Sequence, residues 1–319
     1  ECRSWQVLFR VLRGAEHFAE RLAAIERAIE LNPRNEEAHD WKAWLLAENQ
    51  RIDEALAACR PAPWGEQPPV MLQMRAARIC AGHGRTDRAI ELYRKIVTED
   101  PVNADAWQGL ADAYDAAGHK PEYLDAAEHL QKLRPKDAIP MGYLGHALKV
   151  NDRPADAKAW FRRAFDLDPG YEYAGFQLFD LHLEANETAE AAWMLSTMKS
   201  RKASPYITAR EVQLAVRSRD LSAAEAGLRE LTGRPDNDDW PLQAAVEAAA
   251  GQMTTSRLDH ILRDALTQPA FHPSVGHLWL KHVGPHRCWF TKVRFVERLI
   301  GLGSSRASSW TVADLMVSL

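Results

Sequence analysis

Histidines and one cysteine gather near the C-terminal end of the sequence, and both residue types bind transition metals. The stretch FHPSVGHLWLKHVGPHRCWF holds His272, and then the weak candidates for metal ligands, His277, His282, His286 and Cys288. The spacings of five, five and four residues between the histidines do not place three imidazoles on one helical face. Gly284 and Pro285 interrupt any helix before the last histidine, and no HExxH pattern occurs. We therefore expect no metal or other cofactor, and interpret these histidines as part of a terminal repeat or cap.

Other chemical motifs are equally weak. Cys288 follows His286 closely, but side chains so near in sequence rarely align as nucleophile and base, and no GxSxG elbow is present. The glycine motif AGHGR (81–85) lies where each unit has its inter-helix turn, and GLGSSR (301–306) lacks the third glycine and preceding strand of a phosphate-binding loop. DNDD (236–239) lacks the spaced acids of a calcium loop and indicates a turn with a helix N-cap. The sequence therefore offers no strong catalytic motif.

Composition excludes other classes of function. The 319 residues carry a formal net charge of −4, whereas non-specific nucleic-acid binding needs a basic surface. No apolar run approaches the roughly 20 residues of a membrane helix, and no signal-peptide pattern is visible. The four cysteines are scattered, which is typical of reduced thiols, so we expect a cytoplasmic protein. Because the sequence lacks an initiating Met and stops in the helix-like ADLMVSL, we also expect a piece of a longer protein.

Prolines reveal an internal repeat. Pro101, Pro135 and Pro169 are evenly spaced, and Pro33 lies two of the same intervals before the first of them. Between successive prolines, small and apolar residues recur at steps of three and four, with Gly, Asn or Asp at a central turn. In the unit from Ala104, for example, Trp107, Leu110, Ala111 and Tyr114 precede Gly118, and Ala127 and Leu130 precede Pro135. This pattern predicts pairs of amphipathic helices, each pair ended by a proline.

The pattern resembles the tetratricopeptide repeat, which has W-x2-L-G-x2-Y, then Ala, an aromatic residue and Pro within one repeat of about 34 residues. The resemblance covers six units from Cys2 to Ala203, with departures at Lys42, Tyr123 and Gly175. It implies an all-α fold, a right-handed α-solenoid superhelix of helix-turn-helix repeats. We expect about six units in 1–205, two degenerate helical repeats in 206–270, and a C-terminal helical cap or docking segment in 271–319.

In this family the first helix of each pair lines a concave face that binds extended segments of partner proteins. Mapped onto this sequence, the family's inner positions predict a peptide-binding groove at Arg10, Trp44, Met74, Arg78, Asp112, Asp115, His146, Lys149, Tyr173, Phe176 and Asp180. Met71 and Ile139 belong to the same face. Aromatic and Met side chains are typical anchors of interfaces, although they could equally pack against the neighbouring unit. The ninth positions do not supply the carboxylate clamp with which some members bind chaperone tails.

The favoured hypothesis is a non-catalytic adaptor that binds a protein or peptide, with no nucleic-acid or membrane partner. The alternative is the substrate-recognition or regulatory module of a larger enzyme whose catalytic domain lies outside this chain. The segment KVRFVERLIGLG (292–303) has an apolar and a basic face. We expect it to cap the last repeat, with docking to a domain outside this chain as the alternative.

Overall fold

Helices make up the regular structure of the chain. The computed structural model describes residues 17–235, 238–268, 270–288 and 291–296. Within these ranges no strand occurs, and consecutive α-helices pack as hairpins joined by short turns. The contacts divide the chain into two compact units, 1–167 and 168–319. The predicted all-α solenoid of helix-turn-helix repeats is confirmed, while the number of repeats in each predicted segment stays a prediction.

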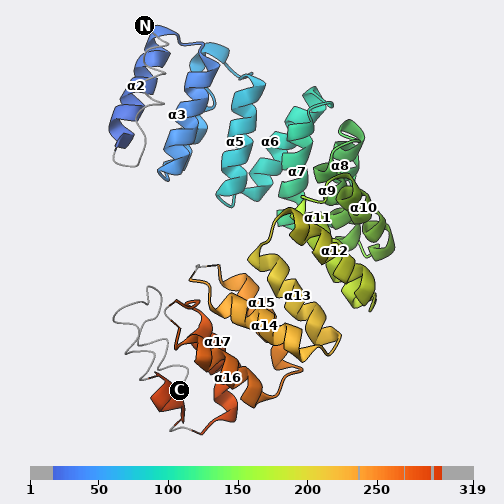
Figure 1. Ribbon diagram of the computed structural model, residues 1–319. Coiled ribbons are helices and arrows are strands. Elements are labelled where there is room, and N and C mark those ends of the chain that lie inside the picture. Colours follow the sequence, from blue (N-terminus) through green and yellow to red (C-terminus); the bar gives the residue numbers. More distant parts are fainter. Residues whose placement is uncertain (1–16, 236–237, 269, 289–290, 297–319) are drawn as a thin grey trace. The chain divides into compact units, whose positions relative to one another are not determined.

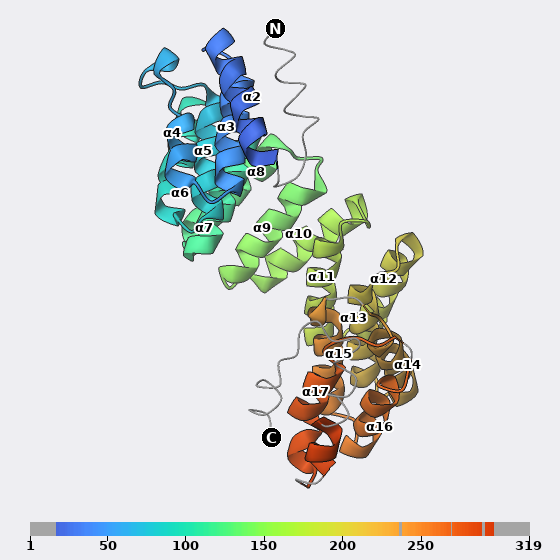
Figure 2. The same ribbon diagram turned by 90° about the vertical axis from the view of Figure 1, so that its left-hand side faces the viewer.

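The first unit stacks its hairpins in chain order (Figures 1 and 2). Its helices are α2 (Phe18–Leu31), α3 (Glu36–Glu48), α4 (Ile52–Ala58), α5 (Val70–Gly82), α6 (Thr86–Glu99), α7 (Ala104–Ala117), α8 (Lys120–Leu133), α9 (Ala138–Val150) and α10 (Pro154–Leu167), with a 3₁₀ turn at Ala62–Trp64. The first helices of the hairpins, α3, α5, α7 and α9, carry the predicted inner positions. We call their common surface the first-helix face of this unit.

The predicted boundary residues begin and end these helices. Helix α6 ends at Glu99, two residues before Pro101, and the Asn103 side chain then caps α7 by accepting a hydrogen bond from the Ala106 N–H. Gly118 ends α7 with a φ of 71°, the left-handed conformation that glycine adopts without strain. The repeat spacing therefore reflects backbone chemistry at the helix ends.

Small residues let the two helices of a hairpin approach closely. Ala89 and Ala111 are fully buried. A Cβ added to Gly145 on α9 would lie 2.8 Å from ring carbons of Phe161 on α10, which is nearer than real Cβ atoms come. The phenyl ring thus occupies the space that a larger residue at Gly145 would need.

The described part of the second unit continues the same pattern with three hairpins, one further helix and a helical segment at 291–296. Its helices are α11 (Glu172–Glu184), α12 (Thr188–Arg201), α13 (Pro205–Arg217), α14 (Leu221–Thr232), α15 (Asp239–Ala250), α16 (Thr255–Ala265) and α17 (Val275–His282), followed by a 3₁₀ turn at Gly284–His286. Helices α13 and α15 pack side by side (Figure 1). Here the first-helix face is formed by α11, α13 and α15.

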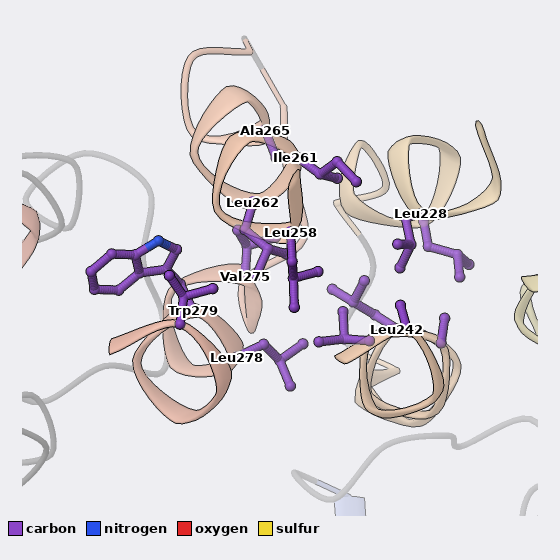
Figure 3. Close-up of a cluster of buried hydrophobic side chains, with 14 of the residues drawn as sticks. Leu228, Leu242, Leu258, Ile261, Leu262, Ala265, Val275, Leu278 and Trp279 are labelled. Carbon is purple, nitrogen blue, oxygen red and sulfur yellow. The ribbon is translucent and has the colours of Figure 1, made fainter. Parts of the chain in front are cut away.

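One apolar core joins α14, α15, α16 and α17. Its buried side chains include Leu228, Leu242, Leu258, Ile261, Leu262, Ala265, Val275, Leu278 and Trp279 (Figure 3). Trp279 is fully buried, and its indole N–H donates to Asp259 Oδ1 at 2.6 Å. Because the ring is apolar and its one donor has a partner, Trp279 fits this core without loss of a hydrogen bond.

The described start of the predicted cap packs against this core. The Phe295 ring stacks on Trp279 with 3.7 Å between ring centroids, and both Phe295 and Val296 are buried. Arg287 donates to Asp259 at 2.6 Å, so the segment after α17 is also held by an ion pair. Residues 291–296 therefore pack on this core, and the choice between a cap and a docking segment stays a prediction. The rest of KVRFVERLIGLG, and GLGSSR with it, lies outside the described residues.

Candidate partner-binding surface

The predicted groove residues nearest the N-terminus differ in exposure. Arg10 lies outside the described residues. Trp44 on α3 is half-buried, with the guanidinium carbon of Arg21 5.3 Å from the centroid of its ring. Met74 on α5 is only 7% exposed, whereas Met71 is 40% exposed. The packing alternative therefore describes Met74, because a buried thioether offers no surface to a partner.

Asp112 on α7 is the centre of the surface that α7 and α9 share. The Tyr143 hydroxyl on α9 donates to Asp112 Oδ1 at 2.6 Å, and Gln108 Nε2 donates to that hydroxyl at 3.4 Å. Asp112 is exposed and forms no ion pair with any described residue. The carboxylate is thus oriented by a hydrogen bond but has no cationic partner within the described chain.

The surroundings of Asp112 disfavour its negative charge. Loss of hydrating water around the carboxyl raises the pKa of Asp112, and the nearby carboxylate of Asp115 raises it further. The hydrogen bond from Tyr143 lowers the pKa of Asp112, and this effect is smaller than that of burial but larger than that of Asp115. A cation brought to this position would therefore relieve an unfavourable charge.

Asp115 and His146 lie next to this carboxylate. His146 Nδ1 is 3.9 Å from Asp115 Oδ2 and 3.1 Å from the hydroxyl oxygen of Tyr123. Tyr123 replaces the family's small residue yet is buried, so its hydroxyl has become part of this polar cluster. Burial lowers the pKa of His146, with an opposing effect from Asp115 and a further lowering from Lys149. The neutral imidazole is favoured, so it does not cancel the charge of Asp115 at neutral pH.

Arg78 on α5 supplies a positive charge on the same face. Its side chain is exposed and forms no ion pair with any residue in the described ranges. Burial raises the pKa of the neighbouring Tyr93 hydroxyl to about 12, although the positive charge of Arg78 opposes that rise. Adjacent first helices thus present a cation, Arg78, and an anion, Asp112, neither of which has an ion-pair partner in the described chain.

Unlike Arg78 and Asp112, the neighbouring residues Arg75 and Asp40 form an ion pair with each other. Arg75 on α5 donates two hydrogen bonds, both of 2.7 Å, to the carboxylate of Asp40 on α3. Both side chains are mostly buried, and the bidentate geometry locks α3 to α5. Asp40 and Arg75 are therefore structural, whereas Arg78 and Asp112 remain open to a partner.

The predicted residues of the second unit form a separate cluster on α11 and α13. Tyr173 is 38% exposed, whereas Phe176 is buried beneath the guanidinium of Arg210, so the packing alternative describes Phe176. Asp180 Oδ2 lies 3.7 Å from Arg210 Nη2, which is an ion pair longer than a hydrogen bond.

Several residues of these surfaces were not predicted from the sequence. Tyr143 and Arg210 orient carboxylates from the neighbouring first helix, and neither occupies an inner position of the family pattern. Tyr206 and Trp240 occupy the same helix position as Tyr173, the second residue of α13, α15 and α11 respectively. Extending the repeat register past Pro205 would have found both of them.

The weak metal-ligand candidates near the C-terminus differ in exposure. His277, His286 and Cys288 are exposed, and His282 is half-buried. Within the described ranges, no three His, Cys, Asp or Glu side chains converge to hold a metal ion. Burial lowers the pKa of His282, whose Nε2 has no hydrogen-bond partner among the described residues.

Membrane insertion and compartment are separate questions. No helix in the part of the chain that the structure describes is long and apolar enough to cross a bilayer. The cytoplasmic location stays a prediction.

Comparisons with known proteins agree with this architecture. Two tetratricopeptide repeat models match residues 7–68 and 81–139. A tetratricopeptide repeat protein of Parabacteroides merdae is 11% identical over 76% of this chain and 98% of its own, with a TM-score of 0.55. PilF of Pseudomonas aeruginosa is 16% identical over 61% of this chain and 90% of its own, with a TM-score of 0.51.

A third solved structure is YrrB, described as a tetratricopeptide repeat protein with an unusual peptide-binding site. It is 14% identical over 55% of this chain and 90% of its own, with a TM-score of 0.43. A search of curated proteins finds no match.

Stacked helix hairpins with small residues at their contacts define an all-α helical-repeat protein of the solenoid class. The two repeat models support membership of the tetratricopeptide repeat family.

Proposed function

We propose that this chain is a non-catalytic scaffold that binds a protein or peptide partner on the first-helix face of its first unit. Asp112 and Asp115 receive a Lys or Arg side chain of the partner, and Arg78 receives an acceptor, either a carboxylate or a main-chain carbonyl. The observation that carries this proposal is the carboxylate of Asp112, which has no ion-pair partner in the described chain and is oriented by Tyr143.

The contacts around the Asp112 carboxylate support the binding of a cation here. The charge of Asp112 has no counter-ion in the described chain and is disfavoured by the nearby carboxylate of Asp115, so an incoming cation gains from both carboxylates. Tyr143 fixes one carboxylate oxygen at 2.6 Å, so the second oxygen is held in place for the partner. Ile139, which is 45% exposed on α9, offers apolar contact near this polar centre.

Site-specific cross-linking tests the placement of the site. A photo-cross-linking phenylalanine analogue replaces Ile139 on the first-helix face or, as a matched control, Asp125 on α8, whose side chain is 70% exposed. We expect a cross-linked partner from the Ile139 position that the change of Asp112 and Asp115 to Lys abolishes. A partner that cross-links equally from Asp125, or that survives the charge reversal, would contradict the proposed site.

A further inference from the structure

Three aromatic side chains recur at one helix position in the second unit. Tyr173, Tyr206 and Trp240 are the second residues of α11, α13 and α15. Tyr173 is 38% exposed, Trp240 is 44% exposed and Tyr206 is half-buried. The rings of Tyr206 and Trp240 stack, with 5.4 Å between centroids and 20° between planes. We call these three residues the aromatic ladder.

A buried cation lies beneath the aromatic ladder. The guanidinium carbon of Arg210 is 3.9 Å from the Phe176 ring centroid and 5.0 Å from that of Trp240. Arg210 is only 7% exposed, and its Nε and Nη1 atoms have no hydrogen-bond partner among the described residues. Asp180 lies 3.7 Å from Nη2 and is the carboxylate that faces it. Unsatisfied buried donors beside exposed rings indicate a site whose ligand supplies acceptors.

The charges around the aromatic ladder restrict the ligand. A partner's Lys or Arg placed on these rings would meet the positive charge of Arg210 close by. An acidic partner would meet Asp238 and Glu172, whose negative charges reach the Tyr206 hydroxyl and raise its pKa. We therefore expect a ligand that offers uncharged hydrogen-bond acceptors.

The donors and rings of this surface match one backbone conformation. Trp240 is 44% exposed and its Nε1 has no hydrogen-bond partner within the described ranges, so the ladder offers an N–H donor together with flat rings. A polyproline II segment offers the complement, since proline supplies flat pyrrolidine rings and carbonyl acceptors but no N–H donors. Such segments bind aromatic-lined grooves with little entropic cost, because their extended shape is already formed.

We propose that the aromatic ladder binds an uncharged proline-rich segment of a partner protein. Prolines stack on Tyr206 and Trp240, and a main-chain carbonyl accepts a hydrogen bond from Trp240 Nε1. A groove of about 670 Å³ continues from Asp180 along the same face, lined by Gln213, Arg217 and Gln252, and it accommodates the following residues of the segment. This site is independent of Asp112 and takes a different ligand chemistry.

Titration with defined decapeptides tests the proposal. Calorimetry compares an end-capped decaproline with a Gly-Ser decamer and with Lys-rich and Glu-rich decamers of equal length. We expect decaproline to bind at least tenfold more tightly than the other three peptides. Equal binding of the Gly-Ser decamer, or tighter binding of a charged decamer, would overturn the proposed ligand class.

Variants place the binding on the ladder. Trp240→Ala is expected to weaken decaproline binding at least tenfold, and Trp240→Phe, which keeps a ring but loses the N–H, less strongly. The matched control is Trp193→Ala on α12, because Trp193 is 48% exposed on the second helix of its hairpin. We expect that control, and the change of Asp112 and Asp115 to Lys, to leave the affinity within twofold of wild type. Equal losses in the Trp240 and Trp193 variants, each with a wild-type melting curve, would overturn the site.

Discussion

The guanidinium carbon of Arg210 lies 3.9 Å from the centroid of the Phe176 ring. Burial lowers the pKa of Arg210, and the opposing influence of Asp180 is smaller. The charge is therefore held in the second unit by ring faces and by one carboxylate at 3.7 Å. Phe176, predicted as a groove residue, instead supports a cation that the sequence did not single out.

The first prediction concerns this buried charge. Asp180→Asn removes the carboxylate that faces Arg210, and we expect a loss of about 1–3 kcal/mol in the free energy of unfolding. Urea denaturation at pH 7 measures it. In an Arg210→Met background the same change should cost less than about 0.5 kcal/mol, because no buried cation remains. An equal cost in both backgrounds would show that Asp180 does not stabilise Arg210.

Close packing in the first unit gives the second prediction. Gly145→Ala would place a Cβ 2.8 Å from Phe161, so we expect a destabilisation of about 1–3 kcal/mol through displacement of the ring. Gly82→Ala, at the end of α5, is the control, because a Cβ there meets nothing within 4 Å. Denaturation midpoints compare the two variants. If both behave like wild type, α9 and α10 do not pack as closely as described.

The third prediction concerns the effect of Asp112 on the stability of the fold, which is measured separately from partner binding. Its pKa is raised in the folded chain, so the ionised carboxylate opposes folding above that pKa. This effect fades as the pH falls through the folded pKa towards the unfolded value. We expect Asp112→Asn to be at least as stable as wild type at pH 7, by up to about 1 kcal/mol, and the gap to close near pH ~4. Urea midpoints across this range measure it, and a less stable Asn variant at pH 7 would contradict the assigned environment.

The fourth prediction concerns His146, whose pKa is lowered in the folded chain, whereas that of Asp112 is raised. Because burial lowers the pKa of His146, the unfolded chain binds a proton before the folded chain does as the pH falls below about 6.5. Wild type should therefore lose stability relative to His146→Gln between that pH and the folded pKa, by roughly 0.5–1 kcal/mol. His39 and His282 shift in the same direction, so the difference between the two proteins is measured rather than the wild-type curve alone. A difference independent of pH would exclude His146 as the titrating group.

Helix boundaries and repeat register were predictable because they depend on local chemistry. Pro101, Asn103 and Gly118 fix their turns through φ restrictions and capping that one short segment contains. The inner position of Asp112 followed from repeat phase. Its hydrogen bond from Tyr143 did not, because that contact depends on how far the next repeat's helix rotates.

The repeat pattern in the sequence also does not predict which apolar groove candidates are buried. Met74 and Met71 lie three residues apart on α5, yet one is 7% and the other 40% exposed. The distinction is made by neighbouring helices, which periodicity in one helix does not reveal. In the second unit the proline interval shortens between Pro205 and Pro235, so the prolines alone do not mark the register in which Tyr206 and Trp240 follow Tyr173 by 33 and 67 residues.

The most direct measurement of partner binding is the affinity of the segment that cross-links from Ile139. The segment is made as a synthetic peptide and titrated calorimetrically into wild type and two double charge reversals. One changes Asp112 and Asp115 to Lys on the first-helix face, and the other changes Asp125 and Glu128 to Lys on α8, with the same change in net charge. We predict at least tenfold weaker binding for the first variant and an affinity within twofold of wild type for the second. Equal weakening in both variants, or wild-type affinity in the first, would contradict a binding surface centred on Asp112.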